Sequence, residues 1–241
     1  MKAMNTPIEI EATIVSRPIA TRALTFADNP QPRCPVVLLL DCSSSMDGRP
    51  IEELDRGVAQ FYRELRADPI ASMSVEVCVI PFGEQVGVSL PFKTVAETTV
   101  REAQPLVAGG ITPMGAAIRL GLSEITERRN YYRRSGVSAY KPWMVLLTDG
   151  QPNDDWQPAA MLVREMAIRG ELMMVGVGIG SEVDMHTLAR FVPPDPGPYR
   201  LADLQFANFF RWLSDSLRVV SSGSTVVQRA LPNPNQYDWN V

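Results

Sequence analysis

The feature that most constrains the fold is a short apolar run that ends in a carboxylate. Residues 36–40 read VVLLL, and Asp41 follows them directly. A strand that is apolar on both faces is typical of the middle of a parallel sheet, because helices cover both of its faces. Asp41 would then lie at the carboxyl end of a central strand, which is where open α/β sheets bind ligands.

Oxygen-bearing side chains continue beyond this strand end. Asp41, Ser43 and Ser45 are spaced two residues apart, so in an extended chain they point the same way. One carboxylate and two hydroxyls form an all-oxygen cluster that suits a hard cation, above all Mg²⁺. A serine-rich turn without an ion is the alternative, because short motifs have many false positives.

Two later segments favour the metal site. Thr112 precedes Pro113 at an expected helix start, and Asp149 follows a second apolar strand at residues 143–148. Taken singly, Thr112 could be a helix cap and Asp149 a turn former. Their joint appearance in this order favours a shared role at the ends of two strands.

With these residues the chain resembles the von Willebrand factor A domain over residues 34–222. That family's metal-ion-dependent adhesion site (MIDAS) uses an Asp-x-Ser-x-Ser sequence, a loop Thr and a strand-end Asp. The resemblance implies one Mg²⁺, with Mn²⁺ or Ca²⁺ as alternatives, and an open coordination position that a partner's Asp or Glu completes. Ser43, Ser45 and Thr112 would contact the ion directly, and Asp41 and Asp149 would act through water.

A narrower resemblance concerns four segments. Residues 35–46, 48–51, 148–156 and 231–239 are similar to the TerY-type proteins of bacterial tellurite-resistance and stress-response clusters. This implies an adaptor or scaffold whose partners are a metal-dependent protein phosphatase and a protein kinase. Those proteins usually begin almost at the first strand, so the resemblance implies nothing about residues 1–33.

The alternation of strands and helices from residue 36 onward predicts a doubly wound, Rossmann-like α/β fold. We expect a mostly parallel, six-stranded sheet with helices on both faces and one antiparallel edge strand after the turn at residues 83–85. Residues 1–33 predict a β arm and linker, and residues 223–241 a tail. The expected strands are 36–41, 74–82, 86–92, 143–148, 172–177 and 199–201; the expected helices are 51–68, 113–134, 157–169, 184–191 and 204–220.

Charge and composition narrow the function classes. The net charge is −4, so no global attraction to nucleic acid or an anionic membrane is expected. The N-terminus lacks the apolar segment of a signal peptide, which indicates a cytoplasmic protein. The three cysteines lie in or beside expected buried strands and are interpreted as core thiols.

Three other interpretations of single segments remain. A Mg²⁺-dependent phosphohydrolase using Asp41 would need a second acid two residues on, where Ser43 stands, so we expect no enzyme activity. Residues 128–134 (RRNYYRR) could bind nucleic acid, although a solvated helix end is favoured. Asp154, Asp155 and Trp156 are candidates for shaping partner choice, or else turn residues and a core aromatic.

The glycine run at residues 176–180 (GVGIG) superficially matches a dinucleotide-binding loop. It follows the fifth expected strand instead of the first, and no helix start with a suitable acid follows it. We therefore expect these glycines to allow a tight turn.

Overall fold

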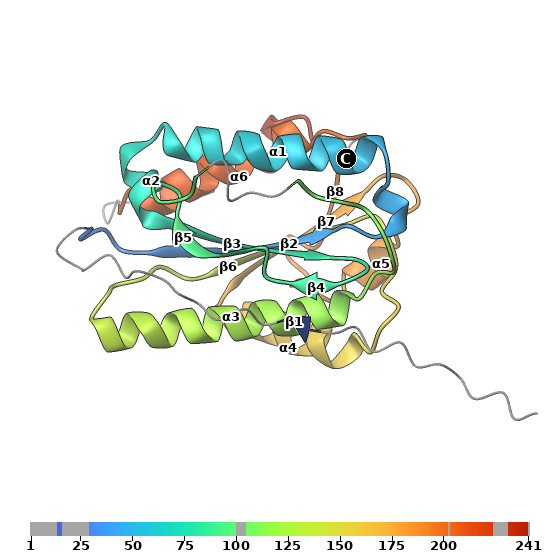
Figure 1. The fold of residues 1–241 in the computed structure, drawn as a ribbon, viewed down its shortest axis with the longest axis horizontal. Coiled ribbons are helices and arrows are strands. Elements are labelled where there is room, and N and C mark those ends of the chain that lie inside the picture. Colours follow the sequence, from blue (N-terminus) through green and yellow to red (C-terminus); the bar gives the residue numbers. More distant parts are fainter. Residues whose placement is uncertain (1–13, 16–28, 100–104, 202, 224–230, 241) are drawn as a thin grey trace, which may run out of the picture.

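A central sheet with helices on both faces forms the body of the molecule (Figure 1). The computed structural model describes residues 14–15, 29–99, 105–201, 203–223 and 231–240. Within them eight strands pair in the order β1-β4-β3-β2-β6-β7-β8, with β5 also paired to β3. The parallel strands of the centre are β2 (Cys34–Asp41), β3 (Val75–Phe82), β6 (Trp143–Thr148), β7 (Met173–Ile179) and β8 (Tyr199–Leu201). The predicted doubly wound α/β fold is confirmed, but within the described residues the sheet has eight strands instead of the predicted six, because β1 joins its edge and the predicted strand at residues 86–92 is divided into β4 and β5.

All eight residues of β2 are buried, as expected for a central strand. Asp41 is the one charged residue among them, and both of its carboxylate oxygens accept hydrogen bonds. The side chains of β2 alternate between two cores. Val36 and Leu38 pack into one, and Val37 and Leu39 pack into the other. This is the period-two pattern of a strand with both faces covered, and it fixes where β2 ends.

The helices divide between the two faces of the sheet (Figure 1). On one face lie α1 (Arg49–Arg66), α2 (Pro69–Ser74) and α6 (Phe206–Ser221). On the other lie α3 (Met114–Ser135), α4 (Gln157–Ile168) and the short α5 (Met185–Leu188). Two 3₁₀ turns, Ser44–Met46 and Pro234–Gln236, complete the elements. No helix in the described ranges has the length and apolar character needed to cross a lipid bilayer.

The predicted antiparallel edge strand at residues 86–92 is broken in two. Strand β4 (Val86–Gly87) and strand β5 (Leu90–Thr94) both pair antiparallel with β3. Between them Ser89 is exposed, and its backbone N and its side-chain Oγ both donate to Val79 O. The pairing register of β3 with β5 also shifts, between Val77 and Val79, which is the behaviour of a bulge and bends the strand.

Helix α2 was not expected, because Pro69 was interpreted only as the end of the preceding helix. Pro69 instead opens a new helix at its first position, where a missing N–H costs nothing. Asp68 caps this helix by accepting hydrogen bonds from Ile70 N and Ala71 N. A proline that stops one helix can therefore start the next.

Two of the three glycines of residues 176–180 serve packing instead of a turn. Gly176 and Gly178 lie within β7, and a Cβ on either would come within 2.7 Å of Val192 or Met185. The glycines thus let the sheet approach α5 and the segment that follows it. Only Gly180, with φ of +79°, has the expected turn conformation.

The segments flanking the domain are partly described. Strand β1 (Ile14–Val15) pairs parallel with β4 at the sheet edge, and the rest of the predicted arm, residues 1–13 and 16–28, lies outside the described residues. Residues 231–240 of the predicted tail pack on the domain. Trp239 is fully buried, and Asn240 forms a bridge with Leu201 of β8. This segment covers the edge of the sheet opposite β1.

Candidate metal centre

The candidate site forms where two neighbouring central strands end. Strands β2 and β6 run parallel, with Leu40 opposite Leu147. Asp41 is the last residue of β2, and Asp149 directly follows β6. The carboxyl ends of parallel neighbours meet at one edge of a sheet, so the strand register alone brings the two carboxylates together.

A chain of hydrogen bonds joins three of the predicted residues. The hydroxyls of Ser43 and Ser45 lie 3.0 Å apart. Ser45 Oγ donates to Asp149 Oδ1 at 2.8 Å, across 104 residues of sequence. Ser43 is buried and Ser45 is exposed, so the chain runs from the interior to the surface.

Asp41 shapes the turn that carries these hydroxyls. Its Oδ1 accepts a hydrogen bond from Ser43 N at 2.8 Å, and its Oδ2 accepts one from Thr148 Oγ1 at 2.5 Å. Both carboxylate oxygens are therefore already bonded, and the side chain is fully buried. Sequence reasoning missed Thr148. The signal was a hydroxyl at the end of an apolar strand, next to the strand that carries Asp41.

Thr112 reaches the same place from the loop before α3. A Cβ on Gly150 would lie 3.2 Å from Thr112 Oγ1, so the hydroxyl borders the turn that follows Asp149. The backbone of Thr112 is held by Asn153, which accepts from Thr112 N and donates to Thr112 O. Thr112 is not the helix cap, because α3 is preceded by Pro113 without a side-chain cap. Thr112 is 6% exposed as a residue, and its hydroxyl makes no hydrogen bond within the described residues.

Glycines bring three loops together behind these side chains. Gly109 N donates to Cys42 O at 2.7 Å, and Ser44 donates to Gly110 O through both its backbone N and its Oγ. A Cβ on Gly110 would lie 2.3 Å from the Cα of Glu84, and the φ of Gly110 is +77°. Gly110 therefore fits where no side chain does. The adjacent pair of glycines was the available sequence signal.

Burial sets the electrostatics of the site. It raises the pKa of Asp41 to about 6; hydrogen bonds from Ser43 and Thr148 oppose the shift, and the charge of Asp149 adds to it. Burial likewise raises the pKa of Asp149. Within the described residues neither carboxylate forms an ion pair with Lys or Arg. A bound cation would supply the missing positive charge and favour both ionised forms.

The donor set fits a hard cation. All the converging side-chain atoms are oxygens, and three of the five donors are neutral hydroxyls. The described part of the chain holds no cluster of three His, Cys, Asp or Glu side chains that could bind an ion. The unbonded hydroxyl of Thr112 and the uncompensated Asp41 are the two observations that fit a metal ion at this point.

Residues 154–156 have structural contacts that match the second interpretation of this segment. Asp154 accepts hydrogen bonds from Gly115 N and Ala116 N, so it caps α3 from a neighbouring loop. Trp156 stacks on Phe191, with ring centroids 5.3 Å apart. Asp155 is exposed and its side chain is left open to solvent.

The basic and aromatic run of residues 128–134 lies at the other end of α3. The helix has 22 residues, so its last turns are about 30 Å from Thr112. Arg128 and Tyr132 point inward to Glu76, at 2.6 and 2.5 Å. The structure does not bring this run to the candidate metal centre.

The fold and the site can now be compared with known proteins. The sequence profile of the von Willebrand factor type A domain matches residues 36–208. No curated protein sequence matches the chain.

Among solved structures, the pilus adhesin SpaC from Lactobacillus rhamnosus GG is 15% identical with a TM-score of 0.60, covering 77% of this chain and 30% of the adhesin. Proximal thread matrix protein 1 from the mussel byssus is 15% identical with a TM-score of 0.53, over 77% of this chain and 48% of that protein. Another structure of the mussel protein has a zinc-occupied MIDAS motif (14% identity, TM-score 0.51, 77% and 48% coverage). The SpRpn10 VWA domain is 12% identical with a TM-score of 0.53, over 73% and 95%.

The chain spans less than half the length of the first two of these proteins. At such identities the likeness shows the fold, and the match of the family profile over more than half of the chain shows the family. The chain belongs to the von Willebrand factor type A domain family.

Proposed function

We propose that this domain is a Mg²⁺-dependent protein-binding module and not an enzyme. The observation that carries the proposal is the hydrogen-bonded chain from Ser43 through Ser45 to Asp149, with the free hydroxyl of Thr112 beside it. Oxygen donors from three separate loops meet there, at the carboxyl ends of two central strands. The proposed ion-binding residues are Asp41, Ser43, Ser45, Thr112 and Asp149.

Each residue has a distinct role in this proposal. The hydroxyls of Ser43, Ser45 and Thr112 are direct ligands. Asp41 and Asp149 orient these ligands by hydrogen bonding and act through water. When bound, the ion offers an open coordination position to an Asp or Glu of a partner protein.

The loop that carries Thr112 indicates which kind of side chain flanks the Asp or Glu of the partner. Val107 is 80% exposed and Ile111 is 48% exposed, and both lie within five residues of Thr112. Exposed apolar side chains beside a polar site are typical of binding surfaces. We infer that the partner presents its carboxylate next to apolar side chains, with Asp155 on the neighbouring loop favouring some partners over others.

The biological setting is proposed from the narrower resemblance. The segments at residues 148–156 and 231–239 are similar to TerY-type proteins. On that basis the domain acts as a cytoplasmic adaptor in a bacterial stress or tellurite-resistance system. Its partners would be a metal-dependent protein phosphatase and a protein kinase.

Calorimetry with Mg²⁺ and Mn²⁺ tests the metal site. Wild-type protein should bind one ion, Asp41→Ala should abolish binding, and Ser45→Ala should weaken it by about tenfold or more. Ser44→Ala is the matched control, because Ser44 lies between two proposed ligands and its hydroxyl donates to Gly110 O instead of joining the hydrogen-bonded chain. Since Asp41 is buried, circular dichroism should show that its variant is folded. Equal affinity in wild type and Ser45→Ala would exclude the assignment.

Partner capture tests the binding role separately. Pull-down from bacterial lysate should retain a protein in Mg²⁺ and release it in EDTA, and Ser45→Ala should lose it in both. An assay with a generic aryl phosphate should show no metal-dependent phosphate release. Release that disappears in Asp41→Ala would instead support the phosphohydrolase.

A further inference from the structure

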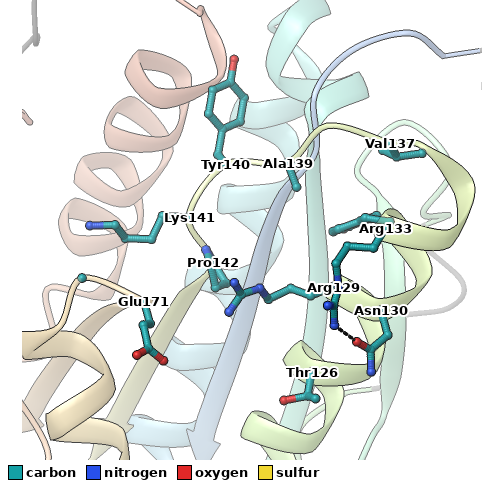
Figure 2. Close-up of a pocket in the computed structure, with 12 residues that line it drawn as sticks. Thr126, Arg129, Asn130, Arg133, Val137, Ala139, Tyr140, Lys141, Pro142 and Glu171 are labelled. Atoms are coloured by element: carbon teal, nitrogen blue, oxygen red, sulfur yellow. Dashed lines mark hydrogen bonds between the residues drawn. The ribbon is translucent and has the colours of Figure 1, made fainter.

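A pocket lies at the opposite end of the sheet from the candidate metal centre. It has a volume of about 570 Å³ (Figure 2). Three segments form its walls: the last turns of α3, the connection at residues 137–142 and the turn at residues 170–171. The last two segments lead into β6 and β7, so the pocket lies at the amino ends of these strands.

The helical period divides the basic run of α3 between two environments. Arg128 and Tyr132, four residues apart, face inward and bind the buried carboxylate of Glu76. Arg129 and Arg133, also four residues apart, are exposed and line the pocket. The inward pair therefore has a structural role. In the outward pair, Arg133 bonds Asn130 Oδ1, and Arg129 makes no hydrogen bond within the described residues.

Cationic side chains from different segments line this space. Figure 2 shows Arg129 extending from α3 toward Pro142. The ammonium of Lys141 lies 3.7 Å from the Cβ position of Gly170, on the far wall. Among the described residues neither Arg129 nor Lys141 forms an ion pair. Two cations thus line one pocket without a direct ion pair to any described residue.

The lining contains fewer acidic than basic side chains. Glu171 is the one carboxylate among its lining residues, and it is paired with Arg169 at 2.6 Å. Arg169 and Arg129 both contribute to the lowered pKa of Glu171. Because Arg129, Arg133 and Lys141 are also in the lining, three positive and one negative side chain give the lining a net charge of plus two.

The helix dipole explains only part of this arrangement. Basic residues in a last turn suit the negative end of a helix, and this accounts for Arg133 and Arg134. Arg129 lies nearly two turns before the end of α3, and Lys141 belongs to another segment. The left-handed Gly136 cap turns the chain so that Gly136 N and Val137 N both donate to Tyr132 O. A ligand is the explanation that covers Arg129 and Lys141.

We propose that this pocket binds a small phosphorylated ligand through a phosphate monoester. A monoester is close to a dianion at neutral pH, because its second pKa is about 6, and it matches the net charge of the lining. Guanidinium groups bind phosphate oxygens in pairs, and Lys adds a point charge. The volume is within the range of small-molecule sites, about 300–1,000 Å³.

Nucleic acid fits the pocket less well. Stacking of bases on a basic and aromatic surface needs exposed aromatic rings beside the cations. Tyr132 is buried against Glu76, so among the tyrosines of the lining only the half-buried Tyr140 could offer a ring, and the net charge of the chain is −4. A concave site with three cations favours a compact anion over a strand.

Titration calorimetry with glucose 6-phosphate tests the proposal, with glucose and inorganic phosphate as reference ligands. EDTA and constant ionic strength exclude binding through a metal ion at the other end of the sheet. Wild type should bind glucose 6-phosphate and inorganic phosphate saturably and should not bind glucose. Arg129→Gln and Lys141→Gln should each raise the Kd about tenfold or more.

Arg134→Gln is the matched control. Arg134 lies on the same last turns of α3 and is exposed, yet it bonds Asn130 O and does not line the pocket. Its Kd should stay within about twofold of wild type, since distant surface charges are screened. No saturable binding, equal weakening in Arg134→Gln, or binding of glucose as tight as of its phosphate would each overturn the proposal. So would retardation of a single-stranded oligonucleotide that depends on Arg129 and falls steeply with salt.

Discussion

At the scale of single residues, the candidate metal centre combines neutral hydroxyls with only two carboxylates. Thr112 is buried as a residue, and its hydroxyl makes no hydrogen bond within the described residues. The hydroxyl oxygen itself is not one of the buried, unpartnered side-chain atoms, so solvent reaches it. An accessible, unbonded hydroxyl beside the other oxygen donors is available to bind an ion.

Replacing Thr112 with Ala should therefore weaken metal and partner binding without unfolding the domain. The side chain borders a surface turn, so the change in the free energy of unfolding should stay within about 1 kcal/mol. Calorimetry with Mg²⁺ and thermal melting measure the two effects separately. Thr112→Ser keeps the hydroxyl and should retain most of the affinity. A large drop in melting temperature with unchanged Mg²⁺ affinity would mark Thr112 as purely structural.

Thr148 is predicted to act through Asp41. Its hydroxyl donates to Asp41 Oδ2 at 2.5 Å, and both residues are buried. Thr148→Val keeps the shape of the side chain and removes that donor, so unfolding should become easier by about 1–3 kcal/mol. The Mg²⁺ affinity should also fall about 10–100-fold, as for other residues that orient metal ligands. Thr148→Ser should restore both; stability loss without a change in affinity would limit Thr148 to a structural role.

At the scale of elements, the site depends on loops that meet more closely than side chains allow. Gly110 lies against Glu84, where a Cβ would be 2.3 Å from a backbone atom. Gly136, at the end of α3, has a similar positive φ, yet open space surrounds its Cβ position. The two glycines thus separate the cost of backbone strain from the cost of a clash.

Gly110→Ala should consequently be much more harmful than Gly136→Ala. In the control, Gly136→Ala, the free energy of unfolding falls only by the cost of a non-glycine residue in the left-handed conformation, about 1–2 kcal/mol. Gly110→Ala must in addition move the backbone at Glu84 and with it the loop that leads to Thr112. Chemical denaturation and Mg²⁺ calorimetry of both variants check this difference. Equal stability losses with wild-type Mg²⁺ affinity in Gly110→Ala would show that this loop tolerates displacement.

The elements also show how far sequence reasoning reaches. Helix α3 was expected at residues 113–134 and spans Met114–Ser135, because a long periodic segment with glycine after its end leaves few alternatives. The clustering of Asp41, Ser45 and Asp149 could be predicted because parallel strands align their ends.

Contacts between loops could not be predicted in the same way. Asn153, Thr148 and Asp154 act on residues that are distant in sequence, and a single sequence does not show which loops meet. The break between β4 and β5 depends on Ser89 bonding Val79 across the sheet. Such tertiary bonds override the local alternation from which one continuous strand was predicted.

At the scale of the whole molecule, a buried network of charged side chains joins residues 29–33, which precede β2, to the sheet and to α3. Glu76 on β3 lies 3.2 Å from Arg33 and 2.6 Å from Arg128, and it accepts a hydrogen bond from Tyr132. Arg33 in turn donates to Asn29 O. The network thus connects residues 29–33 to β3 and α3.

Glu76→Gln should destabilise the domain strongly. Both arginine side chains of the network are largely buried, and removing the carboxylate leaves their charges uncompensated. Breaking such a buried pair typically costs about 3–5 kcal/mol, which urea denaturation can measure. Glu165→Gln, which removes an exposed pair with Arg169, should change stability little. A small effect in Glu76→Gln would show that water reaches the network and replaces the carboxylate.

The far edge of the sheet is closed by the C-terminal segment, and Trp239 is its anchor. Its ring is fully buried against Phe209 and Trp212, with centroids 5.0 and 5.4 Å away. Asn240 beside it pairs with Leu201 of β8. An uncovered edge strand can pair with another chain. We therefore expect this segment both to stabilise the fold and to prevent association through β8.

Trp239→Ala should lower the free energy of unfolding by about 3–5 kcal/mol, the usual cost of removing a large buried aromatic side chain. It should also promote concentration-dependent association, because β8 loses its cover. Tyr237→Phe is the control: it removes only the hydrogen bond to Asp215, worth about 1 kcal/mol, and leaves the edge covered. Urea denaturation and light scattering measure the two effects. A Trp239→Ala protein that is as stable and as monomeric as Tyr237→Phe would show that the segment is not required to close the sheet.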